Sequence, residues 1–474
     1  MKMKYLALLG AALWLGGCGY VQRHNAPKVD SPETYHNASL DTAFRDGAWW
    51  KDFGDESLNT LMDEAIANSP SLEVSLARLQ QFRALSRSTR ASLFPSVTVN
   101  GSYQDGERAF GGIGKINLDY YDVSAVAQYE IDLWGKLSAR RRAAFGDLLA
   151  SENDTRTALL TLTSQVARTY FQIVDLKEQQ RLLEQTLASN QSAYDIVSHR
   201  YLLGVVTSLD VYQSEANLAQ TKAQKATVDA TLATTEHLLS VLLGRYPESD
   251  ISGIASALPP KVLDIGQGIP TDLLARRPDI RAARARLLAN DARWASANAA
   301  LLPSFNLTGT LGNVNKDLEK ALDPEELLWN LVAGLTAPIF QGGRLAGEAQ
   351  RNEAAFYESA ATYKQVVLNA FREVEDALVR GDKMRERITQ LETQTEAAGN
   401  SLRVAEEQYQ QGIIGYLQVL IAQNSYYQAQ SSLISARREL LNNRVDLATA
   451  LGGSWTDEVL RSREPSPKLH AEVR

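Results

Sequence analysis

The chain has 474 residues and a formal net charge of −7, which is long for a single compact domain unless it contains repeats or very long elements. Apolar residues make up 44% and charged residues 22%, a composition that excludes a disordered chain. No long basic run occurs, so the sequence argues against a nucleic-acid partner.

Residues 1–17 have the features of a secretory signal peptide. A positively charged start precedes an apolar run at 5–15, which is too short for a bilayer that needs about 20 residues. The sequence Leu15-Gly16-Gly17-Cys18 then resembles the lipobox of bacterial lipoproteins, which would make Cys18 the first mature residue and the carrier of a covalent lipid. Gly19 follows in place of Asp, which by the same resemblance favours the outer membrane. An ordinary signal peptide with an incidental cysteine is the alternative.

Cys18 is also the only cysteine of the chain. An intrachain disulfide and a cysteine-based zinc site are therefore excluded. We expect no cofactor other than the lipid on Cys18.

Residues 96–104 and 121–134 predict a first pair of β-strands. Within 96–104, Val97, Val99 and Tyr103 alternate with polar residues, and 121–134 shows the same period of two. Such alternation gives one apolar and one polar face, as in a transmembrane strand of about 9–11 residues. A half-buried sheet in a soluble protein has the same pattern and remains an alternative. A second pair is predicted at 304–312 and 328–340, with Gly/Asp-rich loops at 104–120 and 312–327.

A very long helix is predicted after each strand pair. No proline occurs between Pro95 and Pro247, or between Pro338 and Pro465, and apolar residues recur at helical spacing. A helix of about 65 residues would extend roughly 100 Å. A globular domain cannot bury such a helix along its length, so it must belong to a long bundle or coiled coil. Return helices are expected at 208–243 and 416–451, and shorter helices at 58–93 and 272–301.

An internal repeat relates the two halves of the chain. Pro95 and Pro303 are 208 residues apart, and the same offset joins Gly135 to Gly343. Repetition at a fixed offset indicates a duplicated unit. The predicted domains are the signal peptide at 1–17, a lipidated extension at 18–60, a first repeat at 61–244, a linker at 245–270, a second repeat at 271–452 and a tail at 453–474.

Four candidate membrane strands per chain have a consequence for assembly. An open sheet edge cannot lie in hydrocarbon, because its backbone polar groups would lack partners. Barrels of this kind begin at about eight strands, so several chains must share one. A dimer would supply about eight strands and a trimer about twelve, and periodicity does not choose between them. Side chains fill an eight-stranded interior, which argues against the dimer if the barrel conducts.

Several motifs resemble those of the TolC-like outer membrane factors of the OprM and NodT type. Trp49-Trp50 with Phe53-Gly54-Asp55 resembles their start, and Leu274-Ala275-Arg276-Arg277-Pro278 resembles their midpoint signature. Arg200-Tyr201-x-x-Gly204 and Gln408-Tyr409-x-x-Gly412 are similar to their two hairpin-tip motifs. The resemblance covers nearly the whole mature chain.

The resemblance implies a mainly α protein with membrane β-structure. It implies a homotrimer whose twelve-stranded outer-membrane barrel continues into an α-helical periplasmic tunnel. The partners would be a periplasmic adaptor (membrane fusion protein) and an inner-membrane transporter, of the resistance-nodulation-division type. Such a chain is a passive exit duct for substrates such as drugs, and not an enzyme. A type I protein secretion channel and a non-channel periplasmic coiled-coil lipoprotein are the alternatives, and the cargo is left open.

Two segments are the predicted hairpin tips, and by resemblance they contact the adaptor. Small and aliphatic residues there would suit packing against an adaptor helix, whereas the simpler interpretation is turn chemistry alone. The tip residues are Gly204, Val205, Val206, Thr207, Ser208, Leu209, Gly412, Ile413, Ile414, Gly415, Tyr416 and Leu417.

The predicted periplasmic gate departs from the family pattern. Relatives commonly carry an Asp shortly after the second tip, where this chain has Ile421. An acidic ring is therefore in doubt, and Leu417 and Ile421 are expected to form an apolar constriction beside Gln418. Asp210 is the one comparable carboxylate. It would face the lumen or a neighbouring helix.

Glu130 and Asp132 lie on the polar side of the alternation at 121–134. They are predicted to face the pore, although a solvated face would read the same. Arg276, Arg277 and Asp279 are expected to start and pack a helix. The five histidines show no metal-ligand spacing, and no phosphate-binding loop occurs, so no catalytic site is predicted.

Overall fold

The computed structural model describes residues 35, 47–110, 114–249, 251, 253–259, 270–453 and 455–463. The predicted signal peptide at 1–17 and Cys18 lie outside these residues. The chain forms two compact units. The described parts of the first unit are Arg78–Glu152 and Ala282–Gln365. The second unit takes the described residues of Asp30–Ala77, Asn153–Arg281 and Val366–Arg474.

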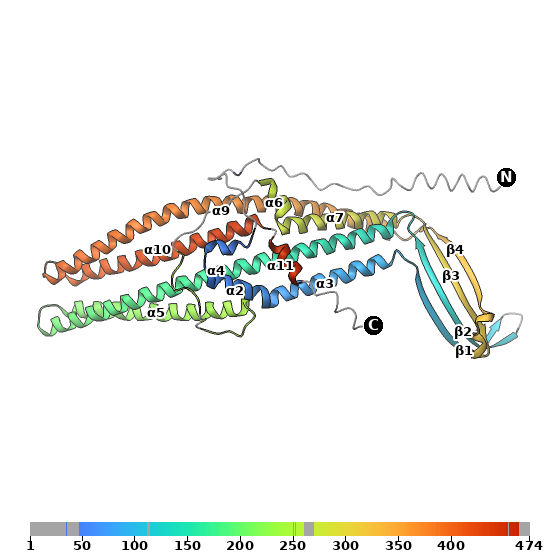
Figure 1. Cartoon of the computed structure of the whole chain (residues 1–474), viewed down its shortest axis with the longest axis horizontal. Helices are drawn as coiled ribbons and strands as arrows, with labels where there is room; N and C mark the ends of the chain where they lie inside the picture. The colour runs from blue at the N-terminus through green and yellow to red at the C-terminus, as the bar shows by residue number, and fades with distance from the viewer. Residues whose placement is uncertain are drawn as a thin grey trace. The chain divides into compact units, whose positions relative to one another are not determined.

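A four-stranded antiparallel sheet dominates the first unit (Figure 1). Neighbours in the sequence are neighbours in the sheet, in the order β1-β2-β3-β4. The strands are β1 (Ser96–Phe110), β2 (Gly114–Ile131), β3 (Ser304–Asn315) and β4 (Leu328–Thr336). Two short helical turns, α8 (Leu318–Ala321) and η3 (Pro324–Glu326), connect β3 to β4.

The register of the sheet gathers the apolar stripes of all four strands on one face. Val99 is the cross-strand partner of Ala125, Ala125 of Leu311, and Leu311 of Trp329. Directly opposed residues project to the same side of a sheet, so these four side chains form one apolar row. One residue along, the row Thr98–Val126–Thr310–Asn330 belongs to the other, mainly polar face. The prediction of a sheet with one apolar and one polar face, made from the period-two alternation, is therefore confirmed for these rows.

The strand limits differ from the prediction in four places. β3 continues to Asn315, where a loop from 312 was expected. The β1–β2 ladder continues from Asp105↔Asp119 to Phe110↔Gly114, where a loop at 104–120 was expected. The positions that would continue the apolar face of 96–104, such as Asp105, Glu107 and Asn117, carry polar residues, so that apolar stripe stops although the backbone still pairs. β2 ends at Ile131 rather than 134, and β4 ends at Thr336 rather than 340. Pro338 has no N–H to continue the ladder.

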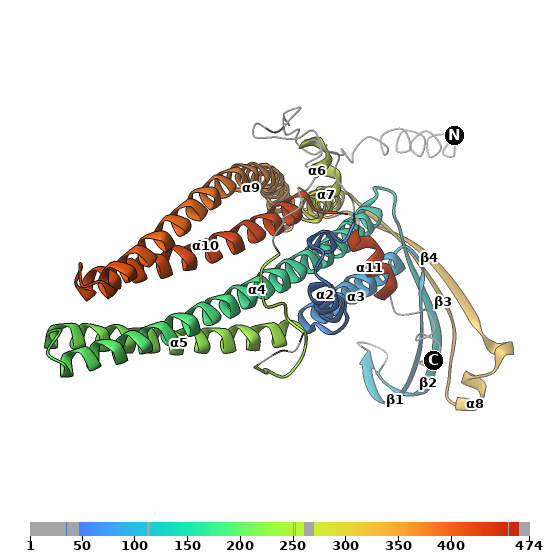
Figure 2. The same ribbon diagram turned by 60° about the vertical axis from the view of Figure 1, so that its left-hand side comes forward.

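Two helices of 67 residues follow the strand pairs, α4 (Lys136–Leu202) and α9 (Arg344–Gln410). Each is succeeded by an antiparallel partner, α5 (Ser208–Leu242) and α10 (Tyr416–Leu451). Both views show α5 running back beside α4, and α10 beside α9 (Figures 1 and 2). The long helices and their return helices were predicted, and their equal lengths agree with a duplicated unit.

The shorter helical segments predicted at 58–93 and 272–301 are each divided at a proline. α2 (Glu56–Asn68) is followed by α3 (Pro70–Ala91), and α6 (Pro270–Arg276) by α7 (Pro278–Ala299). Each second helix begins with proline, which disfavours helical geometry in the residue before it. Proline is well suited to a first helical turn, so both breaks follow from the sequence.

The core of the second unit is rich in aromatic residues. The turn η2 (Trp49–Phe53) places Trp50 edge-on against Trp455 of α11 (Trp455–Arg463), with ring centroids 4.8 Å apart. Phe53 contacts Phe171 of α4 at 5.0 Å. These contacts fix the ends of the described chain onto α4. Within the described residues, no helix combines the length and apolar character that crossing a membrane would require.

Candidate functional site

The two hairpin tips turn with the same backbone geometry. At the first tip, the N–H of Val205 donates to the Arg200 carbonyl over 2.9 Å, and Gly204 adopts a left-handed φ of 72°. At the second, the N–H of Ile413 donates to the Gln408 carbonyl over 2.9 Å, and Gly412 has a φ of 74°. This is the glycine-dependent ending of an α-helix. Both glycines therefore set the direction of the chain at the turn.

The tips differ in how their return helices begin. Thr207 and Asp210 form a reciprocal capping box at the start of α5. The Thr207 N–H and hydroxyl donate to the Asp210 carboxylate over 2.9 and 2.8 Å. At the start of α10, Gly415 offers no side-chain cap. Asp210, predicted as a possible gate residue, is thus engaged in holding the first turn of α5.

A small apolar cluster joins the two tips within the second unit. Its buried members are Val197 of α4, Ala405 of α9, and Tyr416, Val419 and Ala422 of α10. Val206 and Ile414, from the two turns, pack against it. The tips are therefore one packed structure rather than two independent loops.

Tyr416 is only 3% exposed, although it was predicted to contact a partner at the tip. Its ring lies 5.8 Å from that of Tyr409, and burial raises the pKa of its phenol to about 12. The phenol is thus un-ionised at neutral pH. Tyr416 therefore packs inside the tip. The sequence alone did not distinguish a buried packing role for this residue from a role in contacting a partner.

Several predicted tip and gate residues do present apolar side chains. Leu417 and Ile421 are one helical turn apart on α10, and both are exposed. Gln418 beside them is also exposed. The exposed apolar residues at and beside the tips are Tyr201, Leu202, Leu203, Val205, Leu209, Tyr212, Ile413, Leu417 and Ile421.

Polar pairs tie α4 of the first hairpin to α10 of the second. Gln423 donates to Ser189 over 3.1 Å near the tips, and Gln179 donates to the Ser431 carbonyl over 3.1 Å further along. Beyond these, Arg168 pairs with Asp446. Because the partners are hundreds of residues apart, no local sequence pattern identifies them.

The contacts between α4 and α10 form a seam, and Asp175 of α4 is a buried carboxylate within it. Its nearest cation is Arg438, with 3.6 Å between guanidinium Nε and carboxylate oxygen, and one carboxylate oxygen has no hydrogen-bond partner. Burial raises the pKa of Asp175 to about 6, against the opposing attraction of Arg438. The Asp175 carboxylate therefore binds a proton at mildly acidic pH.

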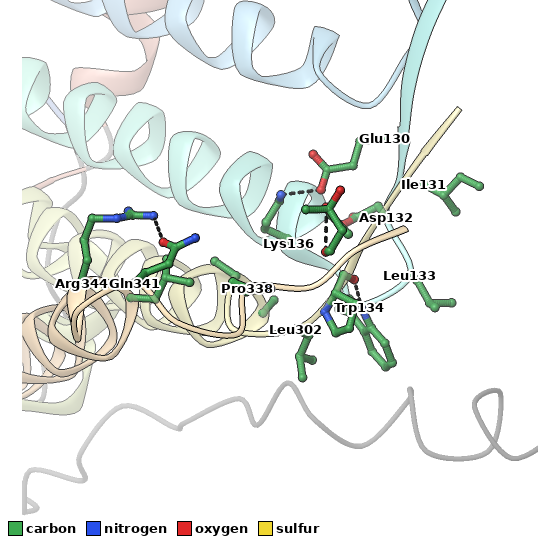
Figure 3. A pocket seen from close by; sticks show the side chains of 16 residues that line it. Glu130, Ile131, Asp132, Leu133, Trp134, Lys136, Leu302, Pro338, Gln341 and Arg344 are labelled. Carbon is green, nitrogen blue, oxygen red and sulfur yellow. Dashed lines mark hydrogen bonds and ion pairs between the residues drawn. The ribbon is translucent and has the colours of Figure 1, made fainter. Parts of the chain in front are cut away.

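Glu130 and Asp132 lie at the end of β2, where the sheet passes into α4 (Figure 3). Asp132 directly follows the last strand residue, and its carboxylate accepts hydrogen bonds from the N–H groups of Leu137 and Ser138 over 2.8 and 2.7 Å. Glu130 pairs with Lys136. Both carboxylates thus have local partners at this junction, and their predicted pore-facing role stays a prediction.

Arg277 ties the midpoint motif to the second hairpin. Its buried guanidinium donates to Asp279 over 2.6 Å, to Glu373 over 2.7 Å and to the Ala450 carbonyl over 3.2 Å. Arg276, by contrast, pairs with Asp272 at the surface. The residues of the midpoint motif therefore pack helices, as the sequence indicated.

A two-faced sheet that continues into helical hairpins far longer than any globular core is the architecture of an outer-membrane channel with a helical tunnel. The comparisons with known proteins agree. The family model described as outer membrane efflux protein matches residues 61–245 and 269–453. The chain belongs to the outer membrane efflux protein family.

The relatives include named export proteins. OpmQ of Pseudomonas aeruginosa, a pyoverdine export outer membrane protein, is 32% identical over 97% of this chain and 98% of its own length. The outer membrane protein OprJ of the same organism is 30% identical over 94% and 95%. The solved structure of the outer-membrane channel OprN matches with a TM-score of 0.86 at 26% identity, covering 92% of this chain and 99% of that one. The protein is thus an outer-membrane efflux channel with a periplasmic tunnel, and its function is transport.

Proposed function

We propose that three copies of this chain form the exit duct of a tripartite efflux pump, with a twelve-stranded barrel in the outer membrane. The observation that carries the proposal is the pair of sheet edges, since β1 and β4 terminate the sheet of the described chain. Every residue of β4 is exposed. Unpaired backbone groups are very unfavourable in hydrocarbon, so β4 of one copy would pair with β1 of the next.

Native mass spectrometry of the full chain extracted from outer membranes tests the assembly. We expect a complex with three times the subunit mass, and discrete conductance steps when it is inserted into a planar bilayer. A stable dimer would contradict the trimer. A water-soluble monomer without conductance would favour the alternative of a coiled-coil lipoprotein.

The tips would meet a periplasmic adaptor linked to a resistance-nodulation-division transporter. Support comes from the exposed apolar side chains of Val205, Leu209 and Ile413 at the turns. Exposed apolar groups on a protein surface are typical of interaction sites. A photo-crosslinking residue at Val205 should capture such an adaptor in cells. Capture of the adaptor of an ABC exporter would instead support type I secretion.

We further propose that the cargo consists of small molecules such as siderophores or antibiotics. Relatives bear names of this kind, OpmQ for pyoverdine and ArpC for antibiotic efflux. Deletion of the gene should lower resistance or siderophore export. The proposal would be contradicted if the deletion left drug resistance and siderophore export unchanged but abolished the secretion of a protein.

Cys18 would carry the lipid that anchors the mature N-terminus. Labelling with a palmitate analogue should modify the wild-type chain, and Cys18→Ser should abolish the label. A Cys18→Ser chain that is still labelled would refute the anchor. The proposed gate comprises Leu417, Gln418 and Ile421, with Asp210 as a capping residue beside it.

A further inference from the structure

The connection between β3 and β4 is residues 316–327, named the outer loop below. It contains the turns α8 and η3 and lies at the strand ends that do not continue into helices (Figure 2). The sheet, α8 and η3 all belong to the first unit. α8 contacts β2 as well as β3, so the loop folds back onto the sheet. The face that it covers decides what the loop can touch.

Two asparagines of β3 fix the outer loop to the face that carries the apolar rows. The amide of Asn313 donates to the Lys320 carbonyl over 2.8 Å and to the Glu326 carboxylate over 3.4 Å. The amide of Asn315 donates to the same carboxylate over 3.2 Å. Leu311, Asn313 and Asn315 are two residues apart along the strand, so they project to the same side. The loop therefore covers the side of Leu311.

That side is the outer wall of the barrel. In an outer-membrane channel the lipid-facing side of each strand is apolar, and the side that faces the interior is polar. Leu311 belongs to the apolar row that includes Val99, Ala125 and Trp329. The outer loop thus lies against the wall from outside, and not over the mouth of the pore.

Side chains on the same face mark the level of the loop relative to the membrane. Asn315 is the cross-strand partner of Tyr121, and Tyr121 of Tyr103, with the two rings 4.7 Å apart. Two residues further along, Asp105 is paired with Asp119 on this face. Aromatic residues gather where a membrane meets water, and carboxylates are unfavourable inside it. The loop is therefore held at the outer boundary of the membrane.

The outer loop covers polar groups that lipid would leave without partners. A buried amide without a hydrogen bond is unfavourable in an apolar medium, and the loop supplies acceptors for the amide of Asn313. Asn313 is only 8% exposed, and Ala321 of α8 is completely buried. The loop thus replaces lipid over this part of β3, and its own outward side becomes the surface that lipid meets.

α8 is amphipathic in the way that this position requires. Leu318 and Leu322 are one helical turn apart, next to the buried Ala321, and are 48% and 59% exposed. Glu319 and Lys320 occupy the remaining side of the turn, and both are exposed. An apolar side combined with a charged side is typical of segments that lie in a membrane interface.

We propose that the outer loop is an interfacial anchor, in which Leu318 and Leu322 insert among the acyl chains of the outer-leaflet lipids. Continuity with the lipid-facing wall favours this occupant, because the two leucines lie on the same side of the sheet as the exposed Leu311 and Trp329. The inference rests on the proposed barrel, since only a membrane-embedded sheet places lipid beside the loop.

Spin labelling of the full chain in vesicles of phospholipid and lipopolysaccharide tests the anchor. Cys18 is the only native cysteine, so one added cysteine marks one new position, and the wild-type chain is the blank. Labels at Leu318→Cys and Leu322→Cys should be relaxed more by oxygen, which concentrates in acyl chains, than by a water-soluble nickel chelate. Glu319→Cys is the matched control and should show the reverse order.

Leu331→Cys separates failure of the anchor from failure of the barrel. Leu331 lies deeper on the same face of β4 and is 59% exposed, so lipid should reach it wherever the loop lies. Nickel access at Leu318→Cys and Leu322→Cys, with oxygen access at Leu331→Cys, overturns the anchor alone. Nickel access at all three positions overturns the proposed barrel as well. Loop labels that neither reagent reaches indicate a protein contact and also overturn the anchor.

Conductance gives an independent readout of where the loop lies. A charged thiol reagent coupled to Glu319→Cys should leave the single-channel conductance unchanged, because the loop is outside the wall. The same reagent at Asn306→Cys should lower the conductance, because Asn306 is on the polar face of β3. A comparable fall at Glu319→Cys would place the loop over the pore and overturn the anchor.

Discussion

The guanidinium carbon of Arg200 lies 4.9 Å from the ring centroid of Tyr409, so the last turn of α4 is bound to the last turn of α9. A cation over an aromatic face is attracted by the ring quadrupole, by about 0.5–1 kcal/mol at partly exposed sites. The contact joins the two hairpins beside the apolar cluster at their tips, against which Tyr409 also packs. It is one of the interactions that an opening movement of one hairpin would have to break.

Tyr409→Leu should therefore loosen the tips. We expect it to increase the closed-state conductance and the entry of a large antibiotic into cells. Tyr201→Leu is the matched control, because Tyr201 is the repeat counterpart of Tyr409 but its ring is 46% exposed. Equal leakage through both variants would show that the Arg200 contact has no special part in closure.

Gly204→Val and Gly412→Val should disturb the turns without preventing assembly. A β-branched residue in the left-handed region costs roughly 1–3 kcal/mol, while no neighbouring atom obstructs the new side chain. We expect normal trimer yield and reduced efflux, measured as drug susceptibility. Gly347→Ala is the control, since Gly347 is helical and unobstructed and should tolerate the change. Full resistance in the valine variants would count against the tips as the working site.

Asp210→Ala and Thr207→Ala should have the same effect, because both remove the capping box of α5. Loss of such a cap costs about 1 kcal/mol and frays the first turn, which hydrogen exchange of residues 208–211 would detect. We expect ion selectivity to be unchanged in both. A change in selectivity confined to Asp210→Ala would instead assign the Asp210 charge to the conduction path.

The seam between α4 and α10 should be more stable in mild acid. The pKa of Asp175 in the folded chain is about 6, above the ordinary 3.8, so the folded form binds the proton more tightly than the unfolded form. This contribution is fully present below about pH 4 and is lost as the pH rises through 6.

Asp175→Asn should remove that dependence, because an amide stays neutral at every pH. Between pH 4.5 and 7.5, stability should shift by roughly 2 kcal/mol in favour of the variant relative to the wild type, measured by thermal unfolding at both pH values. The surface variant Asp52→Asn should show no such shift. Parallel pH profiles for wild type and Asp175→Asn would exclude the seam as the titrating element.

Local patterns account for most of the fold. The absence of proline over long stretches predicted α4 and α9, and alternation at 96–104 predicted the two-faced sheet. The prediction of a loop at 104–120 was wrong, because the face that is apolar in 96–104 becomes polar at Asp105, Glu107 and Asn117 while the backbone ladder continues. Contacts between distant residues, such as Gln179 with Ser431, leave no trace in either segment alone.

The candidate site was located but not fully interpreted. Glycines at 204 and 412 marked the turns, since their left-handed geometry depends on residue type. The sequence could not reveal that Tyr416 is buried, because an aromatic residue at a helix start suits a surface and a core equally. Nor did it reveal that Asp132 caps α4, since a carboxylate just past a strand reads as the next residue of that strand.

The identical length of α4 and α9 limits how this channel can vary in evolution. The last turns of α4 and α9 must lie side by side with their apolar faces toward each other, because Val197 and Ala405 pack into a single cluster there. One inserted residue in α4 alone would shift its end by about 1.5 Å and turn it by about 100°. Natural variants of different reach should therefore carry insertions or deletions in matched sets across all four hairpin helices, in steps close to whole heptads.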